Sequence, residues 1–338
     1  MLRGAPSRVG VCFDIDGVLV RGKEVLAGAR EAVQKLRSVG VPYVFLTNGG
    51  GHLESVRARR LSDRLEVPVD PAQVVLAHSP MQQLVPEFGK KRVMILGCRE
   101  EVDVAKAYGF ERVTTPQAFH ALHPELYSFR AASPHPHDDH HEDPIEALVV
   151  MHDPADWHIE VQVCLDILLG RDPVRMSSGE PEVDPTHRTQ VVPLYNSNDD
   201  FIYASSYPHP RLAQGAFIET LSALFRKTTG GTSELKVNRF GKPHVVTFDF
   251  ARKILEKQHD GPLERIFMIG DNPDADVAGA NNAGDPFRSV LLETGVFKQG
   301  QDTNNADFVV PGVWDAIEQL VLPLHEELSK AGSSSSTK

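Results

Sequence analysis

The stretch Val9-Gly-Val-Cys-Phe-Asp-Ile-Asp-Gly17 decides the fold that this sequence predicts. Its apolar run, Val9 to Phe13, has the length and β-branched content of a buried strand. The run delivers Asp14 and Asp16 to a turn opened by Gly17. Ligands bind at the carboxyl ends of strands in parallel α/β sheets. Two carboxylates this close indicate a bound cation, a shared proton or both, and the alternative is an Asx turn with solvated acids.

A second strand is predicted at 41–46, after a helix at 28–39 whose apolar residues have helical spacing. Strand, helix and strand form a βαβ unit, so the two strands should be parallel. The loop that begins with Thr47-Asn48 and continues with three glycines then opens on the same edge as Asp14. Its hydroxyl, amide and backbone N–H groups suit phosphate oxygens, and the alternative is a glycine-rich turn. The next helix, 53–65, carries arginines that we interpret as a solvated face: Arg57, Arg59, Arg60 and Arg64.

Two further signals come from the last third of the chain. Lys242 precedes Pro243, and proline prefers the first helical position, so we expect Lys242 at the cap of a helix. Positive charge there suits a bound anion, and the alternative is a surface lysine. A buried strand at 265–270 then delivers Asp271, with Asp276 following. Those acids could instead complement the dipole of the next helix.

The middle of the chain predicts a second α/β unit, inserted between parts of the first. Strands are expected at 91–96, 145–150 and 191–195, and helices at 100–108, 157–169 and 215–227. Asn198 and Asp199 follow the third of these strands in a polar run, where we expect them either to face a substrate or to form a solvated loop. The histidine-rich stretch 133–144 has no apolar residue to fix its geometry, which favours a mobile loop over a metal site.

The composition and charge of the chain limit the kinds of partner that it can bind. The chain has 338 residues, enough for two domains, and 41% of them are hydrophobic, which supports a buried core. The formal charge of −11 argues against a nucleic acid or an anionic membrane as partner. No apolar run approaches the ~20 residues that span a bilayer. Three scattered cysteines are typical of a reducing compartment.

The joint order of these signals resembles the haloacid dehalogenase superfamily. Its four motifs are Asp-x-Asp-Gly, Ser/Thr, Lys, and Gly-Asp with a second Asp, and all four occur here in that order. The insertion between the threonine and lysine motifs resembles subclass IIA, with a type-II cap domain. The details are most similar to the cat eye syndrome critical region protein 5 group. The resemblance implies a doubly wound parallel sheet, a Rossmann-like hydrolase core at 1–77 and 233–338, with an α/β cap domain at 78–232.

The resemblance also implies a chemistry. It is Mg²⁺-dependent hydrolysis of a phosphoric monoester through an aspartyl-phosphate, in which Asp14 is the nucleophile and Asp16 the general acid and base. Mg²⁺ would bind the Asp14 carboxylate, the backbone carbonyl of Asp16, and Asp271. The phosphate would be bound by Thr47, Asn48 and Lys242. The site would be supported by Asp276. The alternatives are a phosphotransferase or mutase with the same intermediate, or a binding protein that keeps the fold.

The partners expected from the resemblance are a small phosphorylated metabolite and a second copy of the chain, bound through the cap domain. The family group is described as mitochondrial. The first eight residues are basic but too short for a whole targeting segment, so a cytoplasmic location is the alternative.

Overall fold

The computed structural model describes residues 8–335 apart from 130–140, 178–185 and 187. The chain divides into two compact units. The first comprises Met1–Thr47, Glu54–Pro80 and Gly241–Lys338, and the second comprises Asn48–Leu53 and Met81–Phe240. No helix in the described part of the chain is long and apolar enough to cross a membrane.

A parallel sheet of six strands forms the centre of the first unit, in the order β15-β14-β13-β1-β4-β5. From β1 the chain moves outward to β4 and β5, and after the second unit it resumes at β13 beside β1 and moves outward the other way. The strand order therefore reverses between β1 and β13, as the predicted doubly wound fold requires. The bounds are β1 Val9–Phe13, β4 Tyr43–Leu46, β5 Val74–Val75, β13 Arg265–Gly270, β14 Phe287–Leu292 and β15 Phe308–Val310.

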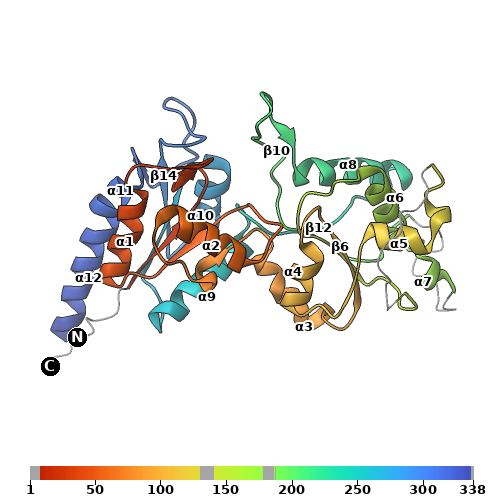
Figure 1. Ribbon diagram of the computed structural model, residues 1–338, viewed down its shortest axis with the longest axis horizontal. Helices are drawn as coiled ribbons and strands as arrows, with labels where there is room; N and C mark the ends of the chain where they lie inside the picture. The colour runs from red at the N-terminus through yellow and green to blue at the C-terminus, as the bar shows by residue number, and fades with distance from the viewer. Residues whose placement is uncertain (1–7, 130–140, 178–185, 187, 336–338) are drawn as a thin grey trace. The chain divides into compact units, whose positions relative to one another are not determined.

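Helices cover both faces of this sheet, because alternate residues of its buried strands point to opposite sides. Val11 and Phe13 pack with one hydrophobic cluster, and Cys12 packs with the other. Helices α1 (Ala29–Val39), α2 (Glu54–Leu65), α11 (Val313–Ala316) and α12 (Leu322–Ser335) lie on the first face (Figure 1). Helices α9 (Val245–His259) and α10 (Ala278–Ala283) lie on the second. A small hairpin, β2 (Val20–Arg21) and β3 (Glu24–Val25), follows Asp16.

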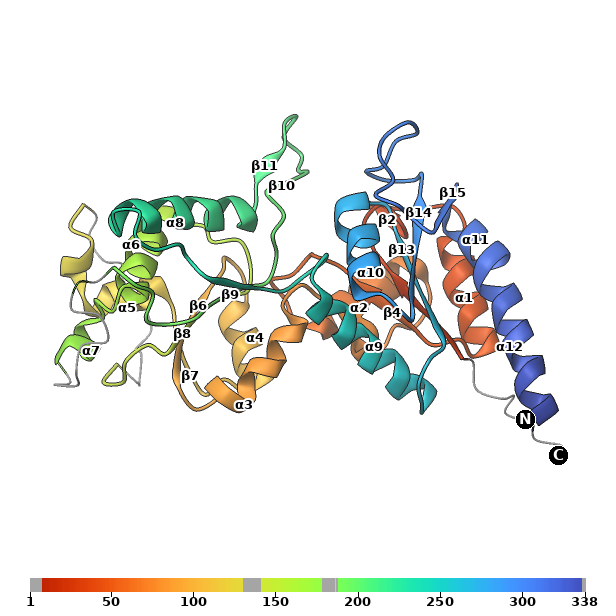
Figure 2. The same ribbon diagram turned by 180° about the vertical axis from the view of Figure 1, so that it is seen from behind.

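The second unit is built on a parallel sheet of five strands, in the order β12-β9-β8-β6-β7. Its strands are β6 Arg92–Leu96, β7 Arg112–Thr114, β8 Ala147–Val150, β9 Leu194–Asn196 and β12 Val237–Arg239. Its helices are α3 Val85–Phe88, α4 Glu101–Tyr108, α5 Pro116–Leu122, α6 Trp157–Leu168, α7 Pro173–Ser177 and α8 Gln214–Thr228. An antiparallel hairpin, β10 (Ile202–Tyr203) and β11 (Arg211–Leu212), projects beyond the start of α8 (Figure 2).

Two sequence expectations need comment. Lys242 does not cap a helix: α9 begins at Val245 with His244 as its N-cap, so that prediction was wrong. The residues before it form a turn, in which Gly241 has a φ of +78° and its carbonyl accepts from the amide of His244 at 2.9 Å. Most of the histidine-rich stretch lies outside the described residues, which resume at His141.

Candidate active site

Asp14 and Asp271 lie at the point where the strand order reverses. Asp14 follows β1, Asp271 follows β13, and the two strands pair in parallel up to Phe13 and Ile269. The amide of Asp14 donates to the Ile269 carbonyl at 2.9 Å. Both carboxylates are almost fully buried, with exposed fractions of 6% and 3%. The fold therefore holds two acids out of water at the edge where α/β proteins bind ligands.

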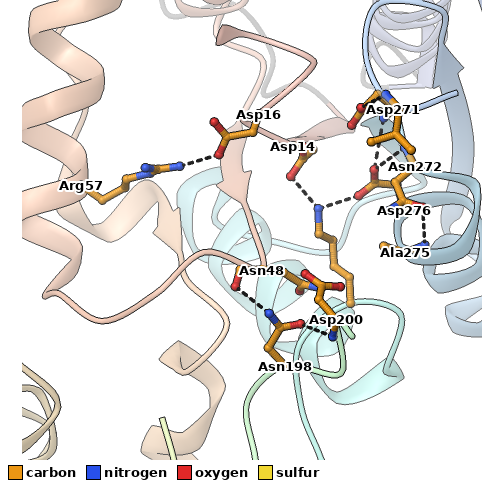
Figure 3. A network of polar contacts seen from close by, with 12 residues as sticks. Asp14, Asp16, Asn48, Arg57, Asn198, Asp200, Asp271, Asn272, Ala275 and Asp276 are labelled. Atoms are coloured by element: carbon orange, nitrogen blue, oxygen red, sulfur yellow. Dashed lines mark hydrogen bonds and ion pairs between the residues drawn. The ribbon is translucent and has the colours of Figure 1, made fainter. Parts of the chain in front are cut away.

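Lys242 brings a positive charge into the same place. Its ammonium donates to Asp14 Oδ1 at 2.6 Å and to Asp276 Oδ1 at 2.6 Å, and only 4% of the residue is exposed (Figure 3). The turn that precedes α9 directs the side chain of Lys242 inward. The alternative from the sequence, a surface lysine, is therefore wrong. These short, charge-assisted bonds fix the ammonium against the Asp14 carboxylate.

Asp276 is held by its own loop. Its Oδ2 accepts from the amides of Asp271 at 3.1 Å and Asn272 at 3.0 Å. The close approach requires glycine at 270, because a Cβ there would lie 2.2 Å from the Asp276 carboxylate. Both oxygens of Asp276 thus have partners within the chain, one of them Lys242.

Asp271 is enclosed on two sides by glycines. Its Oδ2 accepts from the Val296 amide at 2.5 Å. A Cβ at Gly295 would lie 1.7 Å from that oxygen, and a Cβ at Gly17 would lie 2.3 Å from it. Gly17 also has a φ of +91°, which a side chain disfavours. The glycine of the opening motif therefore makes room for an acid some 250 residues later in the sequence.

Burial and mutual repulsion oppose the ionisation of the carboxylates in this cluster. Burial, and after it the nearby charge of Asp276, raise the pKa of Asp271 to about 6. Burial also raises the pKa of Asp14, against the attraction of the Lys242 ammonium. Burial by itself lowers the pKa of Lys242, but Asp14 and Asp276 outweigh it, so that pKa lies above its ordinary value. When all are ionised, these three carboxylates and one ammonium carry a net charge of −2.

A cation would suit that imbalance. One carboxylate oxygen from each of Asp14, Asp271 and Asp276 can be chosen so that all three lie within 4.8 Å of one another. Buried carboxylate oxygens are the donors that Mg²⁺ prefers.

Asp16 does not join this cluster through its side chain. The carboxylate is 65% exposed and pairs with Arg57 of α2, Nη2 to Oδ2, at 3.0 Å (Figure 3). Arg57 is therefore a contact that our sequence interpretation missed when it assigned the arginines of this helix to a solvated face. A basic residue near the start of a helix that follows the Thr47 loop was the available signal.

Thr47 and Asn48 follow β4, the other neighbour of β1. Thr47 is buried, and its amide donates to the Val75 carbonyl at 3.0 Å. The side-chain amide of Asn48 donates to Asp200 Oδ1 at 3.3 Å, a contact within the second unit. Asn48 thus has a partner that the sequence did not indicate.

Asn198 and Asp199 both have partners inside the second unit. Asn198 Nδ2 donates to the Asn48 carbonyl at 3.4 Å, and its Oδ1 accepts from the Asp200 amide at 2.9 Å. Asp199 Oδ1 accepts from Asn196 Nδ2 at 2.8 Å and pairs with Arg239. The run holds its own loop together, and direct substrate contact by these two residues stays a prediction.

Comparison with known proteins identifies the family of the chain. A haloacid dehalogenase-like hydrolase model matches residues 11–111, and a second, HAD-hydrolase-like model matches 239–316. The mitochondrial hydrolase YKR070W of Saccharomyces cerevisiae is 30% identical, over 92% of this chain and 94% of that protein. A p-nitrophenyl phosphatase from Archaeoglobus fulgidus has the same fold, with a TM-score of 0.64 at 18% identity, over 93% of this chain and 100% of that one.

A fused relative also matches. The cardiolipin synthase (CMP-forming)/mitochondrial hydrolase fusion protein of Schizosaccharomyces pombe is 33% identical over 91% of this chain, which spans about half (52%) of that protein. The finer likeness to the cat eye syndrome critical region protein 5 group stays a prediction. The two matching models, the near full-length yeast relative and the shared fold together show that the chain belongs to the haloacid dehalogenase-like hydrolases.

Proposed function

We propose that the protein is a Mg²⁺-dependent phosphatase that hydrolyses a small phosphorylated metabolite through an aspartyl-phosphate. The observation that carries the proposal is the buried contact of Lys242 with Asp14 and Asp276, beside Asp271, where the strand order reverses. The kinship with hydrolases supports it, as does the fold shared with a p-nitrophenyl phosphatase.

In this proposal Asp14 is the nucleophile. One of its carboxylate oxygens forms a bond to phosphorus while the ester P–O bond breaks. Lys242 fixes the Asp14 carboxylate at 2.6 Å and offsets charge on the phosphoryl oxygens. Thr47 and Asn48, at the start of the neighbouring loop, complete the phosphate contacts. Asp276 holds Lys242 in place at 2.6 Å.

Asp16 is the general acid and base. In the first step it gives a proton to the leaving oxygen. In the second it takes a proton from a water whose oxygen bonds to phosphorus while the bond between phosphorus and the Asp14 oxygen breaks. Its exposed carboxylate, now paired with Arg57, has to rotate toward Asp14 to do so. Rotation is inexpensive at an exposed ion pair, which contributes little free energy.

The carboxylates of Asp14 and Asp271 and the backbone carbonyl of Asp16 would hold Mg²⁺. The buried oxygen donors and the uncompensated negative charge fit this ion. When bound, it would favour the ionised, nucleophilic form of Asp14 and neutralise charge on the phosphoryl group.

The second unit is the cap domain of this proposal, inserted between Pro80 and Gly241, and it selects the substrate. The partners are the phosphorylated metabolite and a second copy of the chain. Two yeast relatives are named as mitochondrial hydrolases, which supports a mitochondrial location.

The test is release of phosphate from p-nitrophenyl phosphate. We expect chelation by EDTA to abolish turnover and Mg²⁺ to restore it. Asp14→Asn should lower kcat at least about a thousandfold, because it removes the attacking charge, while the protein stays folded. Asp274→Asn, at an exposed acid near the site, is the matched control. Activity of Asp14→Asn within tenfold of wild type, or full activity after chelation, would contradict the proposal.

A further inference from the structure

The loop Asn48–Leu53 belongs to a different unit from the residues on either side of it. Its flanking residues, Thr47 and Glu54, belong to the first unit, whereas the loop itself groups with the second. Thr47 is fixed to β5 through Val75, and Glu54 accepts from the Ser79 hydroxyl at 2.5 Å. The loop is therefore continuous at both ends with residues of the first unit, while its own contacts lie within the second.

At its first residue the loop is attached by three linked hydrogen bonds (Figure 3). Asn48 Nδ2 donates to Asp200 Oδ1 at 3.3 Å, and Asn198 Nδ2 donates to the Asn48 carbonyl at 3.4 Å. The Asp200 amide donates to Asn198 Oδ1 at 2.9 Å, which fixes Asn198 and Asp200 relative to each other. Both the side chain and the backbone of Asn48 are thus held.

The far end of the loop is attached independently. His52 Nδ1 lies 3.1 Å from Glu100 Oε2, and the Glu100 amide donates to the Gly51 carbonyl at 3.3 Å. Gly51 has a φ of +81°, and a Cβ there would lie 2.6 Å from His152. The loop therefore fits closely against the segments that follow β6 and β8.

The segment that carries Asp200 is held by buried hydrogen bonds and close packing. Asn196 and Gln214 are buried and bonded to each other, Nε2 to Oδ1, at 2.7 Å. Gly215 packs so closely that a Cβ would lie 2.3 Å from the Asp199 carbonyl. The buried polar network gives Asp200 a fixed position from which to hold Asn48.

We propose that Asp200 is a positioning residue, which orders the Thr47 loop through Asn48. The inference rests on the proposed function, because Thr47 begins this loop and is assigned there to the phosphate. Three consecutive glycines, 49–51, carry more conformational entropy than any other residues would. Without a bond to a carboxylate at its start, the loop samples many conformations, and the groups around Thr47 are no longer preorganised. Asp200 therefore controls the order of the phosphate-binding loop.

The experiment compares Asp200→Ala, Asp200→Asn and Glu234→Ala. The last removes an exposed carboxylate of the same unit and is the matched control. Amide hydrogen exchange over residues 47–53 is measured at times of seconds without substrate, and kcat is measured with p-nitrophenyl phosphate. Asp200→Ala should speed exchange and lower kcat about tenfold, the loss expected for a hydrogen bond to a charged group. Asp200→Asn should fall between, because its amide oxygen still accepts from Asn48, and Glu234→Ala should match wild type.

The outcomes separate the inference from the proposed function. An unchanged rate of amide hydrogen exchange over residues 47–53 in Asp200→Ala would show that Asp200 does not order the loop. Faster exchange with unchanged kcat overturns its positioning role. A wild-type protein without phosphatase activity would contradict the proposed function. The comparison of exchange rates would then test only whether Asp200 orders the loop. If Asp200→Ala does not fold, Asn198→Ala removes the other bond to Asn48 and should give the same pair of effects.

Discussion

The ammonium of Lys242 lies out of water between two carboxylates. Buried ion pairs are weak evidence for stability, because desolvation costs about as much as attraction gains. Removing one partner is different, since it leaves the other charges buried and uncompensated. At this site the partners of Lys242 are the nucleophile of the proposed reaction and the acid that holds the lysine in place. Function is therefore the better explanation for burying the charge.

Lys242→Met should lower the free energy of unfolding by about 3–5 kcal/mol, because three buried acids then lack their cation. Urea denaturation measures the change. Lys253→Met, at an exposed position of α9, is the control and should stay near wild type. A Lys242→Met protein as stable as the control would mean that the carboxylates shed their charge at little cost.

The sequence predicts Asp14, Thr47 and Asp271 at one edge of the sheet, because each follows a strand that the apolar pattern locates. It joins Lys242 to them only through the order of the family motifs. It could not predict their partners. Whether the Asp16 carboxylate faces Asp14 or Arg57 depends on a side-chain rotamer, which no spacing encodes. The contact between Asn48 and Asp200 joins residues 152 positions apart, so no local pattern encodes it either.

Strands with long apolar runs were predicted well, and short ones were not. β1 and β13 match their predicted bounds, because five or six consecutive apolar or small residues mark a buried parallel strand. The strands β5, β10 and β11 have two residues each, too few to show a period. β9 was predicted at 191–195 but comprises Leu194–Asn196, because the Val191 amide instead donates to the Leu168 carbonyl at the end of α6.

Helix α6 buries an acid that should make stability depend on pH. Glu160 is inaccessible, and its burial raises the pKa from 4.5 to about 7, although bonds from Gln117 and the Asp156 amide oppose the shift. Between these two values the folded protein holds the proton more tightly than the unfolded chain does. Glu160 therefore adds stability below about pH 4.5 that is lost as the pH rises to about 7.

The measurement is the melting temperature of wild type and Glu160→Gln at several pH values from 4.5 to 8. The difference between the two proteins cancels the other titrating groups. Wild type should lose stability relative to the variant as the pH rises, with no further change above about 7. Glu219→Gln, at an exposed acid of α8, should run parallel to wild type. Parallel curves for Glu160→Gln as well would show that Glu160 ionises normally in the fold.

The division into two units follows from the order of the chain. Pro80 and Gly241 both belong to the first unit, so the main segment of the second, Met81–Phe240, is an insertion between parts of the first. The sequence predicts an inserted unit because apolar runs typical of buried strands recur on both sides of it. The hairpin at 201–212 has two-residue strands, which are too short to show a sequence period.

Those residues form the best candidate surface for the proposed homodimer. All twelve positions from Phe201 to Leu212 are exposed, and they include five large hydrophobic side chains: Phe201, Ile202, Tyr203, Tyr207 and Leu212. Large hydrophobic side chains exposed together favour an interaction site, and a short hairpin leaves open edges that can pair. Two copies related by a two-fold axis would cover both hairpins with one self-complementary contact.

We therefore expect the protein to sediment as a dimer at micromolar concentration, and Ile202→Glu to convert it to a monomer, because the change puts a charge into the buried centre of the contact. Leu224→Glu is the matched control, since this residue is an exposed hydrophobic side chain of α8 in the same unit, outside the hairpin. Sedimentation equilibrium distinguishes the two states. A wild-type monomer at that concentration would rule out the dimer. A dimer that survives Ile202→Glu but dissociates with Leu224→Glu would move the contact from the hairpin to the outer face of α8.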